Sequence, residues 1–484
     1  MSVSLCMIVR NEAEHLGACL VSARGLADEL VVIDTGSTDD TPAIAHAHGA
    51  RVYAFAWCDD FAAARNESLA NARGDWVLWL DADDRIPPTS HAKLAGLIQH
   101  LANDKIAYLM TVVSVGPDGR PVQQASQVRL FRRDPAIRWD YRAHEQILPA
   151  LHRAGDTLRE TDIVIGHVGY MRPEDVDKKL ARNLRLIDLD LESRPLDGHL
   201  LHSRASVLVD TQRAPEALVT IGLWEGAHAQ HKPPVSLCAL KARALAMMCK
   251  DDLGAALACV QSGRQDHPRD AKLAFLEAQI FAARGEASAA EGCLRAHMVA
   301  DGEQAGLDVT DCTIVDYRAR HLLARVLLMQ ARAREALREA RQVTQSRPGY
   351  GPGWLLMAEA AAQCGDDEAF DTACARFAAG AEAATAQVAL RATRLRLAGD
   401  QHSALQAVAM GPVTHPALAP MYAVLLFETG VRGDHLEAAL RQTLTYDAFC
   451  AEAWAIKRSL SSSFQTSPLD RDLVQLRDGM RGDL

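Results

Sequence analysis

Several features are missing from this sequence, and each absence narrows what the chain can be. No run of about 18 or more apolar residues occurs, so no membrane-spanning helix is expected. Basic residues are outnumbered, with 52 Lys and Arg against 62 Asp and Glu. The resulting net charge of −10 argues against a general nucleic-acid binder. No Gly-x-Gly-x-x-Gly or Walker-type loop is present, which disfavours a dinucleotide enzyme or an NTPase.

Closely spaced cysteine pairs are also missing. The eleven cysteines form no Cys-x-x-Cys pair, which excludes a zinc ribbon or a thioredoxin-like motif, and their odd number cannot pair completely within the chain. Free thiols of this kind fit a reducing compartment. The segment 1–10 also lacks the charged start and long apolar run of a signal peptide. We therefore expect a cytoplasmic protein.

Two kinds of sequence meet near residues 170–200. Before this point, short apolar strands such as Ser4–Val9, Leu30–Ile33 and Trp76–Leu80 alternate with helical segments. This pattern predicts an α/β domain with a mostly parallel sheet, in which ligands bind beyond the carboxyl ends of the strands. The remainder is rich in Ala, Leu and Arg and predicts helices alone. The expected parts are an α/β domain over 1–190, a helical domain over 191–460 and a C-terminal tail or capping segment over 461–484.

A repeat runs through the helical part. Its anchors follow one another at steps of 34, 46, 34 and 34 residues, and they are Ala244, Ala278, Ala324, Ala358 and Ala392. The long step predicts an insertion of 12 residues within 298–312. Twelve residues after the anchors come Ala256, Ala290, Ala336, Phe370 and Ala404. This period resembles the tetratricopeptide repeat, whose stacked helix pairs present a concave surface for a peptide or a partner protein. A helical bundle without repeats is the alternative.

The strand Trp76–Leu80 runs directly into Asp81-Ala82-Asp83. Alternate residues of an extended chain face the same way, so both carboxylates can point at one ion. Such hard oxygen ligands suit Mg²⁺ or Mn²⁺. Asp34 follows another strand and could accept hydrogen bonds from a base or a ribose. The alternatives are a polar turn at 81–84 and an Asx-turn with a helix cap after Asp34.

Four ordered segments carry a family resemblance: Ser4–Glu12, Val31–Asp39, Asp59–Asn66 and Asp75–Asp83. Together they resemble family 2 glycosyltransferases of the GT-A fold. The branch that carries tetratricopeptide repeats, which includes peptide S-glycosyltransferases of the sublancin type, is the most similar. The resemblance covers about residues 1–190, and the repeats agree with it independently.

The resemblance implies a nucleotide-sugar donor, UDP-linked, and a Mn²⁺ or Mg²⁺ cofactor. Asp81 and Asp83 would meet the metal and the diphosphate, and the family often has Glu after this motif where this chain has Asp84. The implied donor-binding residues are Arg10, Asn11, Glu12, Asp34, Arg65, Asn66, Asp81, Lys178 and Lys179. The two lysines equally fit a solvated basic face.

Two later residues complete the site that the resemblance implies. GT-A enzymes place an acidic catalytic base near the position of Glu145. They often complete the metal site with a histidine, here His167. An inverting transfer needs such a carboxylate to take the proton of the acceptor. Glu145 could instead cap a helix that starts at Gln146, and His167 could be structural.

We therefore expect an inverting, metal-dependent glycosyltransferase. It would move a sugar from a nucleotide diphosphate-sugar to a Ser, Thr or Cys side chain of a peptide or protein held by the repeats. No nucleic-acid or membrane partner is expected, and a homodimer is compatible with this interpretation. Two alternatives stay open: a transferase acting on lipopolysaccharide or another glycan, and a tetratricopeptide scaffold without activity.

Overall fold

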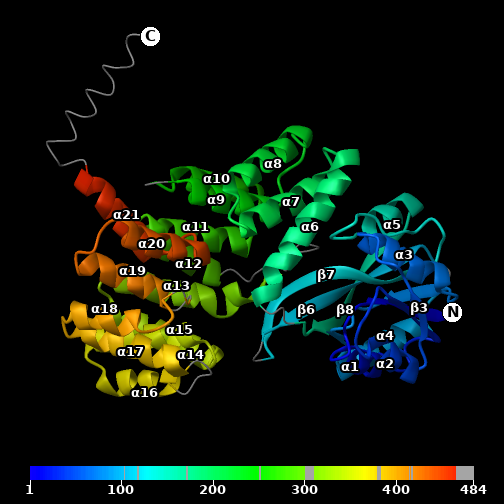
Figure 1. Cartoon of the computed structure of the whole chain (residues 1–484), viewed down its shortest axis with the longest axis horizontal. Helices are drawn as coiled ribbons and strands as arrows, with labels where there is room; N and C mark the ends of the chain where they lie inside the picture. Colours follow the sequence, from blue (N-terminus) through cyan, green and yellow to red (C-terminus); the bar gives the residue numbers. More distant parts are fainter. Residues whose placement is uncertain are drawn as a thin grey trace, which may run out of the picture. The chain divides into compact units, whose positions relative to one another are not determined.

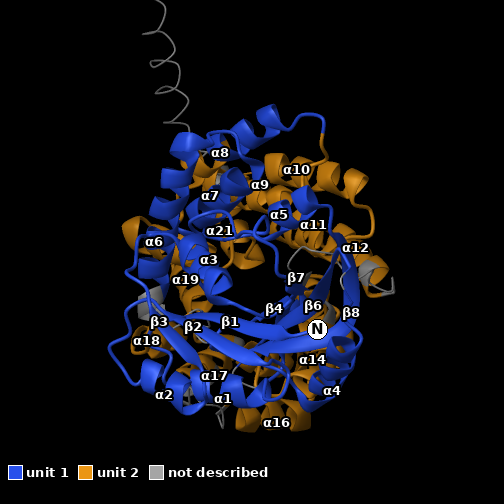
Figure 2. Cartoon of the chain, turned by 90° about the vertical axis from the view of Figure 1, so that its right-hand side faces the viewer, with its two compact units in different colours: residues 1–211, 219–230, 304–313 blue, residues 212–218, 231–303, 314–484 orange. Residues whose placement is uncertain are grey.

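A computed structural model describes residues 1–102, 104–116, 119–169, 173–249, 252–299, 310–378, 383–413, 415 and 418–464. The chain divides into two compact units (Figure 2). One comprises residues 1–211, 219–230 and 304–313, and the other 212–218, 231–303 and 314–484. The predicted boundary at 190/191 falls inside α6 (Pro173–Ser193), and the one at 460/461 inside α21 (Ala451–Phe464). The predicted insertion within 298–312 lies largely outside the described residues.

The first unit is built on one mixed sheet, with the strand order β3-β2-β1-β4-β7-β6-β8-β5 and β9 paired to β7. The strands are β1 (Val3–Val9), β2 (Glu29–Asp34), β3 (Arg51–Ala54), β4 (Trp76–Trp79), β5 (Asp84–Arg85), β6 (Ile106–Val115), β7 (Pro121–Arg132), β8 (Thr157–His167) and β9 (Thr310–Asp311). Strands β1 to β4 pair in parallel, as predicted. Strand β7 instead runs antiparallel to both β4 and β6. The α/β class is confirmed, and its antiparallel half was not indicated by the sequence.

Helices cover both faces of this sheet (Figure 1). One face packs against α1 (Leu16–Ser22), α2 (Thr41–Ala47) and α4 (Pro88–Gln99), and the other against α3 (Phe61–Asn71) and α5 (Leu148–Ala154). Within β1, Leu5 and Met7 belong to the first core, while Cys6 belongs to the second. Because both faces are covered, the central strands β1 and β4 are largely apolar, with Ser4 as the polar exception.

Helices predominate beyond α6. They are α7 (Gly198–Asp210), α8 (Ala214–Ala227), α9 (Val235–Met248), α10 (Gly254–Asp266), α11 (Ala271–Ala283), α12 (Ala287–Val299), η1 (Ile314–Arg318), α13 (Ala319–Met329), α14 (Ala333–Ser346), α15 (Gly351–Cys364), α16 (Asp367–Ala378), α17 (Ala383–Leu397), α18 (Gln401–Ala409), α19 (Ala419–Glu428), α20 (Asp434–Tyr446) and α21. None of the described helices is both long and apolar enough to cross a bilayer.

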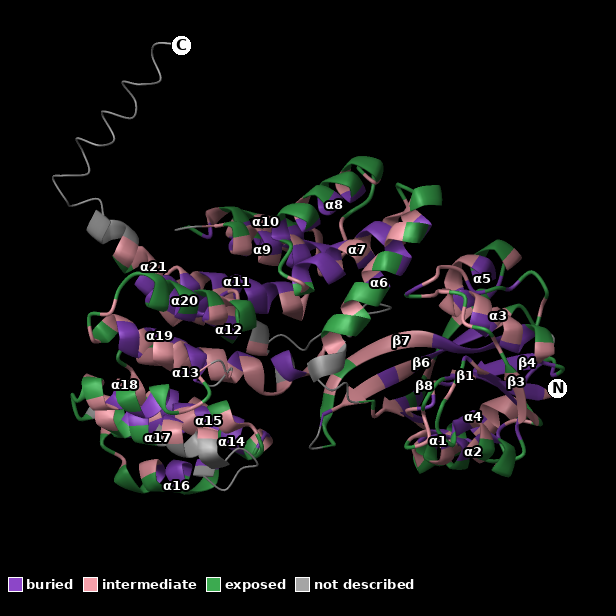
Figure 3. Cartoon of the chain, in the orientation of Figure 1, coloured by how far each residue is buried: buried purple, intermediate pink, exposed green. Residues whose placement is uncertain are grey.

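The repeat anchors explain how these helices pack. All five anchor alanines, and four of the five positions twelve residues later, have no exposed surface. Figure 3 shows buried residues, in purple, alternating with exposed ones along these helices. A larger side chain at such a position would force the paired helices apart. The predicted tetratricopeptide-type solenoid is therefore confirmed.

Candidate active site

A cleft of about 530 Å³ lies in the first unit, where β1 and β4 end. Its walls come from the residues at the ends of these two strands, from α3, from residues 143–145, from His167 and from α6. Ligands of α/β sheets bind at this end of parallel strands. The predicted site residues are therefore expected to lie in this cleft.

The two aspartates of the Asp-x-Asp segment meet different partners in the cleft. The Oδ1 atom of Asp81 accepts a hydrogen bond from Arg65 Nη2 at 2.9 Å, whereas Asp83 Oδ2 lies 3.4 Å from His167 Nε2. Space beside Asp83 is tight, because a Cβ atom on Gly169 would lie 1.9 Å from its Oδ2. The absence of a side chain at Gly169 lets this carboxylate lie next to His167.

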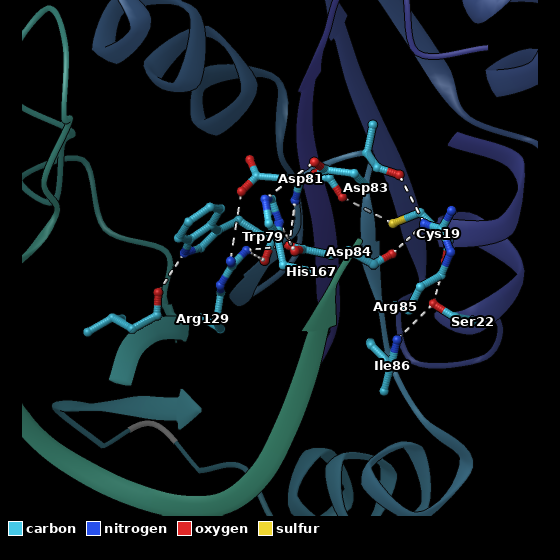
Figure 4. A network of polar contacts seen from close by, with 12 residues as sticks. Cys19, Ser22, Trp79, Asp81, Asp83, Asp84, Arg85, Ile86, Arg129 and His167 are labelled. Atoms are coloured by element: carbon cyan, nitrogen blue, oxygen red, sulfur yellow. Dashed lines mark hydrogen bonds and ion pairs between the residues drawn. The ribbon is translucent and has the colours of Figure 1, made fainter. Parts of the chain in front are cut away.

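Asp84 is fully buried beside these groups (Figure 4). Its Oδ1 atom lies 3.0 Å from His167 Nδ1. Its Oδ2 atom accepts hydrogen bonds from Arg129 Nη1 and from the backbone amide of Asp81, both at 2.8 Å. The pairing of β5 with β8 sets Asp84 directly opposite His167. Asp84 therefore connects the Asp-x-Asp segment to the end of β8.

The donor atoms at this place suit a divalent cation. Ligand atoms of Asp81, Asp84 and His167 lie within 4.8 Å of one another. Both Asp84 oxygens contact protein nitrogen atoms, and its side chain does not line the cleft. Asp81, Asp83 and His167 do line it. Two carboxylates and one imidazole that face a cleft are a fitting donor set for Mn²⁺ or Mg²⁺.

Arg65 connects the metal-type site, meaning the cluster of Asp81, Asp83 and His167, to Glu145. Its Nε atom donates to Glu145 Oε1 at 2.7 Å, while its Nη2 atom donates to Asp81. The guanidinium carbon lies 4.4 Å from the ring centre of Trp79 and 4.9 Å from that of Trp139. Two aromatic rings and two carboxylates therefore hold one buried arginine in a single orientation.

The loop before α5 aims Glu145 at the cleft. Asp140 and Gln146 exchange both backbone hydrogen bonds at 3.0 Å, which closes the loop between them. Within it, Tyr141 and His144 have left-handed backbones, with φ of 74° and 56°. Such conformations are uncommon outside glycine and cost energy. Helix α5 begins only at Leu148, so Glu145 does not cap it.

Carboxylates crowd one part of the cleft, around Glu12, Asp81 and Asp83. Burial, together with Asp83 and Asp81, raises the pKa of Glu12 to about 7. Burial also raises the pKa of Asp83. For Asp81, burial opposes ionisation, but Arg65 and Arg129 outweigh it and lower the pKa. The hydrogen bond to Asp84 raises the pKa of His167. Crowded carboxylates that resist ionisation together would be relieved by a bound cation.

Comparison with known proteins agrees with this geometry. A sequence model described as Glycosyl transferase family 2 matches residues 4–178. A TPR repeat-containing protein of Synechococcus elongatus is 36% identical over 278 residues, which cover 56% of this chain and 67% of the relative. The chain belongs to the family 2 glycosyltransferases that carry tetratricopeptide repeats.

More distant proteins are similar to parts of this glycosyltransferase. The SPbeta prophage-derived glycosyltransferase SunS of Bacillus subtilis is 24% identical over 197 residues, which cover 40% of this chain and 46% of SunS. A glucosyl-3-phosphoglycerate synthase of Mycobacterium tuberculosis, solved with Mn²⁺, UDP and glucosyl-3-phosphoglycerate, aligns with 40% of this chain and 79% of its own. That alignment has 22% identity and a TM-score of 0.30. The match spans less than half of the length of SunS, so the donor, acceptor and partners of this chain are a matter of proposal.

The structure gathers most of the predicted site residues of the glycosyltransferase in one cleft. Those that line it are Arg10, Glu12, Arg65, Asp81, Asp83, Glu145, His167 and Lys179. Asn11, Asp34, Asn66 and Lys178 are not among the lining residues. Their individual roles stay predictions.

Hydrogen bonds to backbone groups account for three of these four side chains. Asp34 Oδ1 accepts from the amide of Ser37 at 3.1 Å, which is the Asx-turn weighed as the alternative. Asn11 Oδ1 accepts from the amide of Thr38 at 2.8 Å. Asn66 pairs with both backbone groups of Trp139, at 2.9 and 2.8 Å. These side chains shape the loops around the cleft.

Sequence reasoning gave no role to Arg129 or Trp79, and it treated Asp84 only as a departure from the family pattern. One signal was available for Arg129, which stands between Val128 and Leu130 in an apolar strand. Charged side chains are rarely buried unless they are paired. A buried partner for Arg129 could therefore have been expected, although only the fold identifies it as Asp84.

Proposed function

We propose that this chain transfers a sugar, with inversion, from a UDP-linked sugar to a Ser, Thr or Cys side chain of a peptide or protein. One observation carries the proposal: Arg65 contacts both Asp81 and Glu145. Donor-binding and proton-accepting carboxylates therefore share one cleft. Inverting transfer needs such an arrangement, with a base beside the reacting carbon and charge compensation at the leaving group.

Each group has a task in this proposal. Glu145 accepts the proton of the acceptor nucleophile, and Arg65 holds its carboxylate in place. Asp81, Asp83 and His167 would hold the divalent cation, which offsets negative charge on the leaving diphosphate when it is bound. Lys179, on α6, lines the same cleft and supplies positive charge for the phosphate oxygens.

The second unit supports a polypeptide acceptor. Tetratricopeptide-type solenoids present an extended surface suited to a peptide segment. We therefore propose that the repeats bind the acceptor polypeptide. Lipopolysaccharide or another glycan is the competing acceptor. A free peptide would accept the sugar if the acceptor is a polypeptide, and would not if it is a glycan.

The first test is hydrolysis of a panel of nucleotide sugars with Mn²⁺ or Mg²⁺. We expect metal-dependent release of one nucleotide by the wild type and its loss in Asp83→Ala. Asp162→Ala is the matched control, because its carboxylate is exposed on β8 and pairs only with Lys93 among the described residues. If no donor is bound or hydrolysed by the wild type, the proposed activity is wrong.

The second test separates base from donor binding. Glu145→Gln keeps a side chain that can still contact Arg65 but cannot take a proton. We expect unchanged UDP affinity and a loss of transfer of about 100-fold or more. NMR of the product would show the anomeric configuration, and a retained configuration would overturn the inverting mechanism.

A further inference from the structure

We propose that Asp84 and Arg129 form a buried positioning pair that orients the metal-facing side chains, and that Asp84 is not itself a ligand. This inference rests on the proposed function, because it concerns how the same cleft holds its cation. It assigns a task to two residues that do not touch the cleft.

The burial of the pair is nearly complete. Asp84 is 0% exposed and Arg129 is 1% exposed. Their ion pair is 2.8 Å long, and the Arg129 guanidinium carbon lies 3.8 Å from the ring centre of Trp79. Trp79 is itself anchored, since its indole donates to the carbonyl of Val128 at 2.6 Å. A charged pair packed in this way has one available geometry.

This geometry determines which nitrogen of His167 faces the cleft. The Asp84 carboxylate already accepts a hydrogen bond from Arg129 through Oδ2, and its Oδ1 atom lies 3.0 Å from His167 Nδ1 as an acceptor for a proton on that nitrogen. The opposite nitrogen, Nε2, then lies 3.4 Å from Asp83 Oδ2. A carboxylate that takes the Nδ1 proton leaves the Nε2 lone pair for a metal ion.

The same carboxylate holds the Asp-x-Asp segment. Asp84 Oδ2 accepts from the backbone amide of Asp81 at 2.8 Å, which closes a turn around Ala82 and Asp83. Arg129 Nη2 also lies 3.8 Å from Asp81 Oδ2. The pair therefore positions His167 and the Asp81 backbone from behind. Because Asp84 is fully buried and does not line the cleft, an ion in the cleft would meet Asp81, Asp83 and His167 instead.

The test measures Mn²⁺ affinity in the presence of UDP, by calorimetry and by the Mn²⁺ EPR signal. Removal of a carboxylate that orients a metal-bound histidine weakens metal binding by about 10- to 100-fold, and we expect this for Asp84→Asn. Asp162→Asn, an exposed carboxylate on the same strand as His167, should leave the affinity unchanged.

A double-mutant cycle distinguishes positioning from ligation. In a His167→Ala background, we expect Asp84→Asn to cost less than about threefold, because its main target is gone. A full 10- to 100-fold loss in that background would make Asp84 a direct ligand. Equal Mn²⁺ affinity of wild type and Asp84→Asn would also overturn the inference, whether or not sugar transfer changed.

A measurement on the unmutated chain covers the case in which Asp84→Asn does not fold. Nitrogen NMR of ¹⁵N-histidine protein at alkaline pH, without metal, reports which ring nitrogen is protonated, and His167→Gln assigns the signal. We expect the proton on Nδ1, and a proton on Nε2 would refute the positioning role. Mn²⁺ binding without transfer to any acceptor would instead refute the proposed function and leave this inference standing.

Discussion

Replacement of Arg65 by Met gives the sharpest test of how the cleft is held together. Methionine can keep contacts with Trp79 and Trp139 but leaves Asp81 and Glu145 without their shared cation. Loss of one partner from a buried ion pair costs about 3–5 kcal/mol. The Arg65 side chain is 9% exposed, but that of Asp81 is 32% exposed, so water can replace part of the contact. We therefore expect a loss of about 3 kcal/mol in the free energy of unfolding.

The assay is urea unfolding followed by circular dichroism, with Arg185→Met as the control. Arg185 pairs with Asp59 at 2.7 Å, but its side chain is 52% exposed, so no measurable change is expected. Adding Glu145→Gln to Arg65→Met should restore part of the stability, because one uncompensated charge is removed. If Arg65→Met behaved like the surface control, or if the second substitution restored nothing, the reasoning about this buried arginine would be refuted.

Further predictions concern the metal-type site. A bound cation must displace a proton from His167, whose pKa is raised, and its charge would favour loss of the proton of nearby Glu12, whose pKa is raised to about 7. Mn²⁺ affinity should therefore fall as the pH falls, by about tenfold from pH 8 to pH 6 for one displaced proton, and a flat profile in calorimetry would contradict this. Gly169→Ala should weaken Mn²⁺ binding about tenfold or more, because its Cβ would displace the Asp83 carboxylate. Gly96→Ala, whose Cβ would meet no atom within 4 Å, should bind Mn²⁺ like the wild type.

Features that depend on local sequence were predictable. The parallel strands β1 to β4 follow from apolar runs with polar ends, and the repeat follows from alanines spaced by 34 residues. Both patterns reflect rules that act within about one turn, strand or helix pair. Asp81 and Asp83 were identified from their motif, but the expected alternation on one strand is not what directs them, because β4 ends at Trp79 and Ala82 and Asp83 lie in a turn.

Roles that depend on residues far apart were less accessible. The antiparallel half of the sheet comes from long strands, β6 and β7, in a segment with no clear alternation of helix and strand. Asn66 stood in an expected motif, yet its side chain pairs with the backbone of Trp139, 73 residues away. A motif identifies a residue position, whereas the direction of a side chain depends on which donors the fold brings near.

The sequence by itself determined the family, the α/β and repeat architecture, and the residues proposed here to hold a cation. Only the tertiary structure decided that Asp84 is buried behind that site with Arg129, and that one arginine, Arg65, joins Asp81 to Glu145. The physical reason is that burial and pairing of charges arise from strands separated by up to 83 residues, as between Asp84 and His167. Spacing along the chain does not specify such contacts, and the packing of the sheet does.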